Sequence, residues 1–138
     1  MTLNAEIALR KVVRTALLAD SLMAARLNQG VYDEAPRHAV LPYVCFGDVI
    51  LRDWSTASDT GLEHQFTLDI WSAGPGSIET IEIADMIVDA LGRASLQPQG
   101  FALIDLRFVS FETRRESNGR MARGRLRFRA VTETRTGG

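Results

Sequence analysis

The residue types that most often perform catalysis are few in this sequence, and their spacing does not suggest a shared site. The single cysteine, Cys45, lies in an apolar run, where a thiol is usually inert. The two histidines are His38 and His64, and His64 directly follows Glu63 at the start of an expected strand. Adjacent strand residues point to opposite faces, so Glu63 and His64 do not form a metal site. We therefore expect no catalytic residue, no metal and no cofactor.

A glycine-rich turn is a possible anion site. Residues 74–77 read Gly-Pro-Gly-Ser before an expected helix, and a helix N-terminus can receive a phosphate. The segment lacks the lysine of a phosphate-binding loop and the glycine spacing of a dinucleotide site. We interpret it as a turn after which Ser77 caps the helix.

Arginine is distributed very unevenly. From Arg107 onward there are nine arginines and three acidic residues, a charge of +6, whereas the rest of the chain carries −7. Such a basic third can contact phosphates, can contact an acidic flank of another copy of the chain, or can be a solvated strand face. Trp54 and Trp71 end two expected strands and are either core residues or interface residues. The set that we expect at a subunit or partner interface is Trp54, Trp71, Arg107, Arg114, Arg115, Arg120, Arg123, Arg125, Arg127 and Arg129.

Length and composition indicate one globular domain. The chain has 138 residues, of which 46% are apolar and 24% charged, which excludes a disordered, collagen-like or coiled-coil protein. We expect a single domain over residues 1–138, with 134–138 as a short tail. One cysteine allows no internal disulfide, and no stretch approaches the roughly 18 apolar residues of a membrane span. We expect no membrane partner and no signal peptide.

Hydrophobic periodicity predicts the order helix, short strand, hairpin, helix, hairpin. In the first helix the apolar stripe contains Leu9, Val13 and Leu17, and Glu6 lies on the polar side. In the second helix we expect a buried stripe of Ile81, Ala84, Val88 and Leu91. The expected elements are helices over 3–19 and 77–94 with a short turn at 22–27, a strand at 31–32, and hairpins formed by 43–54 with 63–72 and by 101–114 with 123–132.

The register of the second hairpin has two alternatives. A two-residue turn at Asn118-Gly119 would place Ser110 opposite Arg127. A longer loop would place Phe108 opposite Phe128, and would collect the arginines of the last strand on the other face beside Arg107. We favour the longer loop, because a one-residue slip exchanges the core and solvent faces.

These elements predict the fold class α+β. We expect an antiparallel sheet of four to five strands, made of two hairpins and covered on one face by two helices. The opposite, arginine-bearing face would then meet water or a partner.

Several short motifs, taken in order, resemble a known family. They lie at residues 42–44, 47, 53–56, 61, 63–64 and 70–72 in the first half, and at 83–84, 90–91, 100, 106–108, 118–120, 123–124 and 126–130 in the second. The most specific are Asp-Trp-Ser-Thr at 53–56 and Arg-Phe-Arg at 127–129. From about residue 3 to 133 the chain resembles the tail-terminator, or tail-completion, family of long-tailed phages, prophages and gene transfer agents.

The resemblance implies a structural virion protein without catalytic residues. It implies a homo-oligomer, a hexameric ring that caps the head-proximal end of the tail tube and stops tube polymerisation. The implied partners are the tail tube protein and the head–tail connector or adaptor protein, and DNA would pass transiently and without sequence preference through the central channel. The expected location is the neck of a virion assembled in the bacterial cytoplasm.

Two other functions remain open from the residues alone. One is a nucleic-acid-binding module that uses the arginine-rich hairpin, from Arg114 to Arg129. The other is a small enzyme or ligand-binding domain, which would need a concave pocket with converging polar groups.

Overall fold

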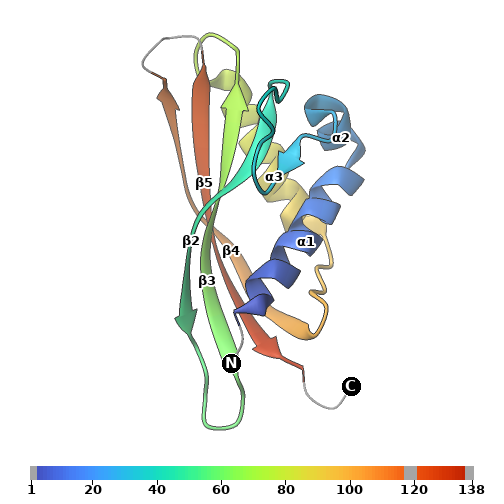
Figure 1. The fold of residues 1–138 in the computed structure, drawn as a ribbon, viewed down its shortest axis with the longest axis vertical. Helices are drawn as coiled ribbons and strands as arrows, with labels where there is room; N and C mark the ends of the chain where they lie inside the picture. Colours follow the sequence, from blue (N-terminus) through green and yellow to red (C-terminus); the bar gives the residue numbers. More distant parts are fainter. Residues whose placement is uncertain (1–2, 117–120, 136–138) are drawn as a thin grey trace.

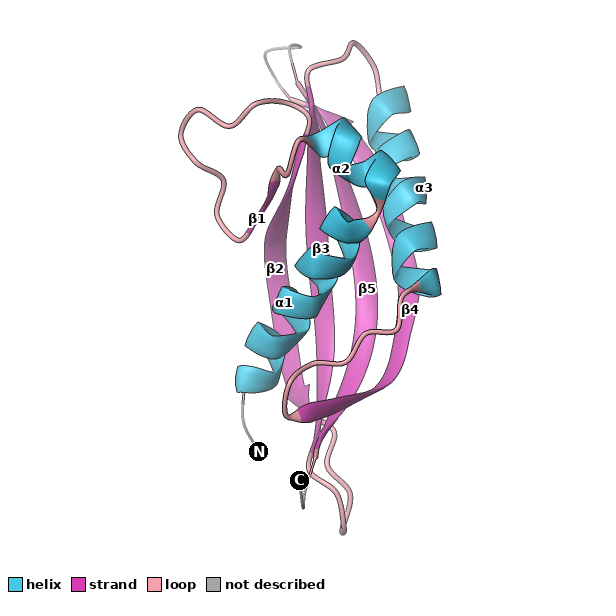
Figure 2. Cartoon of the chain, turned by 90° about the vertical axis from the view of Figure 1, so that its right-hand side faces the viewer, coloured by secondary structure: helices cyan, strands magenta, loops and turns pink. Residues whose placement is uncertain are grey.

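The computed structural model describes residues 3–116 and 121–135 of the chain. The elements are α1 (Asn4–Ala19), α2 (Ser21–Leu27), β1 (Val31–Tyr32), β2 (Tyr43–Asp53), β3 (Gly61–Ser72), α3 (Ile78–Arg93), β4 (Phe101–Arg115) and β5 (Ala122–Thr134). The five strands form one open sheet in the order β1-β2-β3-β5-β4 (Figure 1). The helices all lie against the same face of this sheet (Figure 2). The predicted α+β class is confirmed.

The sheet is antiparallel except at one edge. The hairpins β2–β3 and β4–β5 form as expected, and β3 joins them by pairing along its whole length with β5. The two-residue β1 pairs with β2 in parallel, Val31 opposite Val44. The expected tail begins inside the last strand, because Thr134 ends β5 and the backbone N–H of Arg135 donates to the carbonyl oxygen of Gly100.

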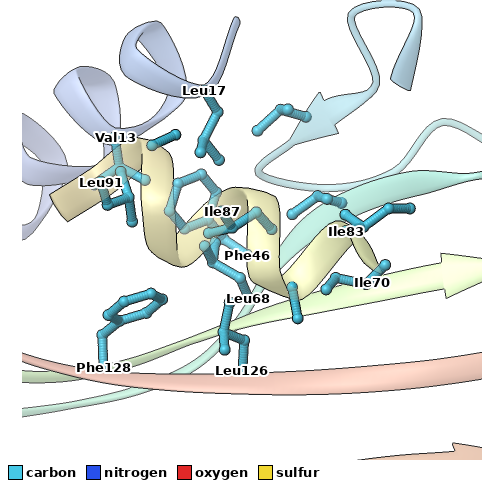
Figure 3. Packing of buried hydrophobic residues seen from close by; sticks show 14 of the residues in the cluster. Val13, Leu17, Phe46, Leu68, Ile70, Ile83, Ile87, Leu91, Leu126 and Phe128 are labelled. Carbon is cyan, nitrogen blue, oxygen red and sulfur yellow. The ribbon is translucent and has the colours of Figure 1, made fainter. Parts of the chain in front are cut away.

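The core lies between the sheet and the helices. Alternate residues of β3 and β5, such as Leu68 and Leu126, point towards α1 and α3 and are fully buried (Figure 3). The rings of Phe66 and Phe128 stack with centroids 5.4 Å apart. Burial of each such side chain contributes about 1.5–3 kcal/mol, so this layer fixes how the helices sit on the sheet.

Two details of the helices differ from the sequence prediction. Ser77 makes no side-chain cap; its carbonyl oxygen instead accepts a hydrogen bond from Thr80 Oγ1 at 2.7 Å. The buried stripe of α3 is rotated, because Ile83 and Ile87 are buried while Ile81 is 48% exposed. Isoleucines occur on both sides of α3, so periodicity alone did not select the side that meets the sheet. The N-terminus of α2 is capped by Asp20, whose Oδ1 accepts a hydrogen bond from the N–H of Met23 at 3.0 Å.

The second hairpin uses both registers that the sequence allowed. Phe108 pairs with Phe128 as we favoured, but from Ser110, opposite Arg127, to the tip the strands follow the other register. A bulge at Val109 accommodates the extra residue. The bulge brings Phe111 opposite Leu126, against the core. Asn118 and Gly119 lie outside the described residues.

Gly124 is required by this close packing, which gives a first prediction. A Cβ atom at Gly124 would lie 2.7 Å from Phe111 Cε1 and 3.0 Å from Thr80 Cβ. We expect Gly124→Ala to lower the free energy of unfolding by about 1–3 kcal/mol, measured by denaturant titration. The control is Gly92→Ala in α3, where no atom lies within 4 Å of the added methyl group. A Gly124→Ala protein as stable as wild type would contradict the packing.

Candidate functional site

The sheet face turned away from the helices, here called the bare face, carries the arginines of the last strand. Residues alternate along β5, so that Leu126 and Phe128 enter the core while Arg125 and Arg127 project from the bare face. Arg107 of β4 lies opposite Arg129, as predicted. The expectation that the arginines of β5 share one face is therefore confirmed.

Arg125 makes a bidentate ion pair with Asp69 on β3. Its Nε lies 2.8 Å from Asp69 Oδ1 and its Nη2 lies 3.1 Å from Oδ2. Asp69 is only 8% exposed, and this hydrogen bonding raises the pKa of Arg125 above its ordinary value. Asp48, on the bulge of β2, lies 3.6 Å from Arg125 Nη1. Such bidentate geometry fixes the guanidinium in one orientation.

Arg129 contacts three groups, one on β3, one on β4 and one in the loop directly after β2. Its Nε donates to Glu63 Oε2 at 2.8 Å, and Asp105 lies 3.6 Å from its Nη1. Its Cζ lies 4.9 Å from the ring centroid of Trp54, a cation–π distance. Burial opposes ionisation of Glu63, but hydrogen bonds from Arg129 and Gln65 lower the pKa of its carboxyl below the usual value.

The opposite end of the bare face repeats the pairing of arginine with tryptophan. Arg123 lies with Cζ 5.6 Å from the ring centroid of Trp71, and Glu116 lies 3.9 Å from its Nε. Trp71 is half-buried and stacks on Tyr43 with centroids 6.5 Å apart. Trp71 is thus a packing residue of the sheet, whereas Trp54 is 52% exposed.

The arginines of the bare face are largely neutralised within the molecule. Five arginines of this face each have a carboxylate oxygen within 4 Å: the pairs are Arg107–Asp105, Arg123–Glu116, Arg125–Asp69, Arg127–Glu112 and Arg129–Glu63. The uneven charge along the sequence therefore does not become a basic patch at this part of the fold.

Sequence reasoning missed the acidic half of these pairs. Glu63 and Asp69 are odd-numbered residues of β3, and Arg125 and Arg129 are odd-numbered residues of β5, so each pair of residues shares one face of its strand. The sequence showed the alternation within each strand. It did not show that β3 pairs with β5, because that pairing joins one hairpin to the other. Of the remaining predicted interface residues, Arg114 and Arg115 are exposed, and Arg120 lies outside the described residues.

A shallow hollow of about 280 Å³ opens at the middle of the bare face. Ile50 and Val109 flank it and are 50% and 56% exposed, and Gln65 and Thr67 contribute polar atoms to its lining. Val109 sits at the bulge of β4, and Ile50 follows the bulge of β2 by two residues. The centre of the bare face is thus apolar and surrounded by ion pairs.

The residues whose side chains could perform catalysis or bind a metal do not lie in this hollow. Cys45 is half-buried, and burial raises the pKa of its thiol. His64 is fully buried between Glu6 and Thr132. Glu6 is therefore on the buried side of α1, opposite to our sequence prediction.

Among residues 3–116 and 121–135, no three side chains of His, Cys, Asp or Glu form a cluster suited to a metal ion. No helix in these residues is long and apolar enough to cross a membrane.

Comparison with known proteins gives consistent matches along the chain. Residues 11–133 match the family described as tail completion protein gp17. A chain from the virion of a native gene transfer agent particle is 29% identical with a TM-score of 0.86, covering 96% of this chain and 99% of that chain. The gp17 protein of bacteriophage SPP1 is 19% identical with a TM-score of 0.64, covering 99% and 96%, and this likeness shows the shared fold.

No protein of the curated sequence set matches the chain. The family match nevertheless runs from the second turn of α1 to the penultimate residue of β5 and so includes every strand of the sheet. The chain belongs to the tail completion protein gp17 family and is a structural protein of the tail-completion class found in phage-type virions.

Proposed function

We propose that this protein forms a ring of six subunits at the head-proximal end of a tail tube, where it stops tube polymerisation and joins the tail to the capsid connector. The observation that carries the proposal is the likeness, over nearly the whole of both chains, to a chain of a native gene transfer agent virion. Family membership agrees with it. The DNA would pass through the centre of the ring.

The bare face supports a role in protein contact. It combines exposed Ile50 and Val109 at its centre and exposed Trp54 at one end with arginines that already have acidic partners. A face of this kind gains free energy from apolar contact and offers little net charge to a polyanion. We therefore propose that the exposed members of the predicted interface set, Trp54 above all, contact other proteins of the neck.

Deletion of the gene tests the proposed function directly. In a host that produces the particles, we expect the deletion to give tubes of uncontrolled length and no joined heads, seen by negative-stain electron microscopy. Wild-type protein supplied from a plasmid should restore joined particles, and immunogold labelling should place it at the neck. Normal particles from the deletion strain would refute the proposal.

The competing function, a nucleic-acid-binding module, rests on the arginine-rich hairpin. Its measurement is binding of the purified protein to duplex DNA across a range of salt concentrations. Submicromolar affinity near physiological salt, with a steep salt dependence, would favour this function over a purely structural one. The internal ion pairs lead us to expect weaker binding.

Among the arginines of the bare face, Arg127 is the one whose substitution best tests assembly without affecting folding. Its side chain is 45% exposed and pairs with Glu112, also exposed, at 3.2 Å. An exposed pair of this kind contributes about 0.2–1 kcal/mol, so Arg127→Glu should leave the protein folded. We expect Arg127→Glu to reduce the yield of joined particles while the midpoint of thermal unfolding stays within a few degrees of wild type. Full particle yield would exclude Arg127 from the interface.

A further inference from the structure

The sheet ends in two open edges. β4 is 15 residues long and pairs only with β5 among the described strands. On the other side, β1 covers only Val44 and Cys45, so the outer edge of β2 is open from Phe46 to Asp53 within the described part of the chain. A long open edge presents unpaired N–H and C=O groups, and proteins usually protect it or use it for pairing.

The β4 edge opens onto the hydrophobic core. Ile104, Phe108 and Val109 are each about half exposed along it. A groove of about 230 Å³ runs between α3 and β4, lined mainly by apolar side chains that include Val88 and Leu106. A strand added to β4 would gain backbone hydrogen bonds and would bury alternate side chains over this groove.

The open edge of β2 also has apolar side chains and an apolar hollow beside it. After the bulge at residues 47–48, the half-buried Val49 and Leu51 lie on the helix side of β2. A hollow of about 470 Å³ adjoins this edge beneath α1, lined in part by Ile7 and Phe46. Each edge therefore offers a strand with apolar side chains on the helix side and an apolar space beside it.

Charge on the helices selects which edges can pair. α1 lies towards the β1–β2 side and α3 towards the β4 side (Figure 2). The exposed side chains of α1 include Lys11 and Arg14, which line the hollow at the β2 edge. Of the four acidic residues of α3, Glu79 and Glu82 lie within 4 Å of Arg26 on α2 and Asp89 pairs with Arg93, which leaves Asp85 exposed without an ion pair among the described residues. Pairing β4 with β4 would bring two copies of Asp85 towards each other, whereas pairing β4 with β2 brings Asp85 of α3 next to the basic side chains of α1 of the neighbour.

We propose that neighbouring subunits join edge to edge, with β4 of one copy pairing with the β2 edge of the next and α3 of the first lying against α1 of the second. The proposal rests on the ring of the proposed function and names its subunit contact. The contact is heterologous, since each copy contributes a different edge to each neighbour. A ring closed in this way covers the open part of β2 and part of the β4 edge in each subunit, and the bulges at Ile104 and Val109 bend the strand at the joint.

A charge exchange between α1 and α3 tests this arrangement. Lys11 and Asp85 are exposed, and within the described residues neither makes an ion pair of 4 Å or less. We expect Lys11→Glu and Asp85→Lys, each alone, to lower the yield of joined particles about tenfold in the complemented deletion strain. Each substitution removes one favourable contact from every subunit interface, and a loss of about 1.4 kcal/mol corresponds to a tenfold change. The double variant should recover most of the wild-type yield.

The strand edge itself is tested by Ile104→Lys, matched to Leu22→Lys on α2, away from both edges. We expect the β4 variant to lose joined particles and the α2 variant to keep them, with circular dichroism confirming that both are folded. If wild type acts at the neck but all edge variants remain functional, or the double variant fails to recover, the edge pairing is wrong and the proposed function stands. If wild type is absent from the neck, the proposed function falls as well.

Discussion

Replacing His64 with alanine is expected to lower the free energy of unfolding by about 3–5 kcal/mol, the largest single effect that we predict. His64 is completely buried, with Nδ1 2.9 Å from Glu6 Oε1 and Nε2 2.9 Å from Thr132 Oγ1. It therefore ties α1 to β3 and β5. The substitution removes both hydrogen bonds, leaves a cavity, and leaves the buried Glu6 carboxylate with Arg10 as its remaining ionic partner.

Denaturant unfolding followed by circular dichroism measures this effect, and His38→Ala is the matched control. His38 lies in the exposed loop before β2, where a substitution changes stability by about 0.5 kcal/mol or less. Equal unfolding midpoints for the two variants would show that the Glu6–His64–Thr132 chain does not stabilise the fold. α1 would then be held by its apolar packing and by contacts such as the hydrogen bond from Arg14 Nε to the carbonyl oxygen of Val31.

Asp69→Ala is expected to destabilise the protein by about 2–3 kcal/mol, because it leaves the Arg125 guanidinium without its bidentate partner. We place the value below that of a fully buried pair because the Arg125 side chain is 20% exposed and retains Asp48 at 3.6 Å. The measurement is again the free energy of unfolding, with Asp48→Ala, at an 89% exposed side chain, as the control.

A double variant separates the cost of an unpaired arginine from the value of the pair. In Asp69→Ala with Arg125→Met, no charge is left without its partner, so we expect much of the lost stability to return. Double-mutant analysis requires the two single variants and the pair together. A double variant no more stable than Asp69→Ala would show that the loss does not come from an unpaired Arg125, and the difference between the double variant and wild type gives the net contribution of the pair.

The sequence predicted the elements well because each depends on local periodicity. Leu9, Val13 and Leu17 identified the buried side of α1, and the alternation of β5 placed its arginines on one face. What could not be predicted depends on distant residues. Glu6 is buried because His64, 58 residues away, meets it, and a helical pattern by itself assigns a charged residue to the solvent side.

The candidate site was half predicted for the same reason. The arginines could be placed, but their acidic partners come from β3 and β4, and only the joining of the two hairpins brings Asp69 to Arg125. The bulge at Val109 was likewise invisible, since either uniform register satisfied part of the apolar pattern. Trp54 and Trp71 looked equivalent at strand ends, and only the packing of Tyr43 against Trp71 distinguishes them.

The separation of these ion pairs along the chain has a consequence for synthesis. Asp69 precedes Arg125 by 56 residues and Glu63 precedes Arg129 by 66, so the carboxylates leave the ribosome before the guanidinium groups that they will hold. An arginine-rich nascent strand is otherwise attracted to ribosomal and messenger RNA. Here the carboxylates of β3 have already left the ribosome when the arginines of β5 emerge, so the order of synthesis favours the intramolecular ion pairs.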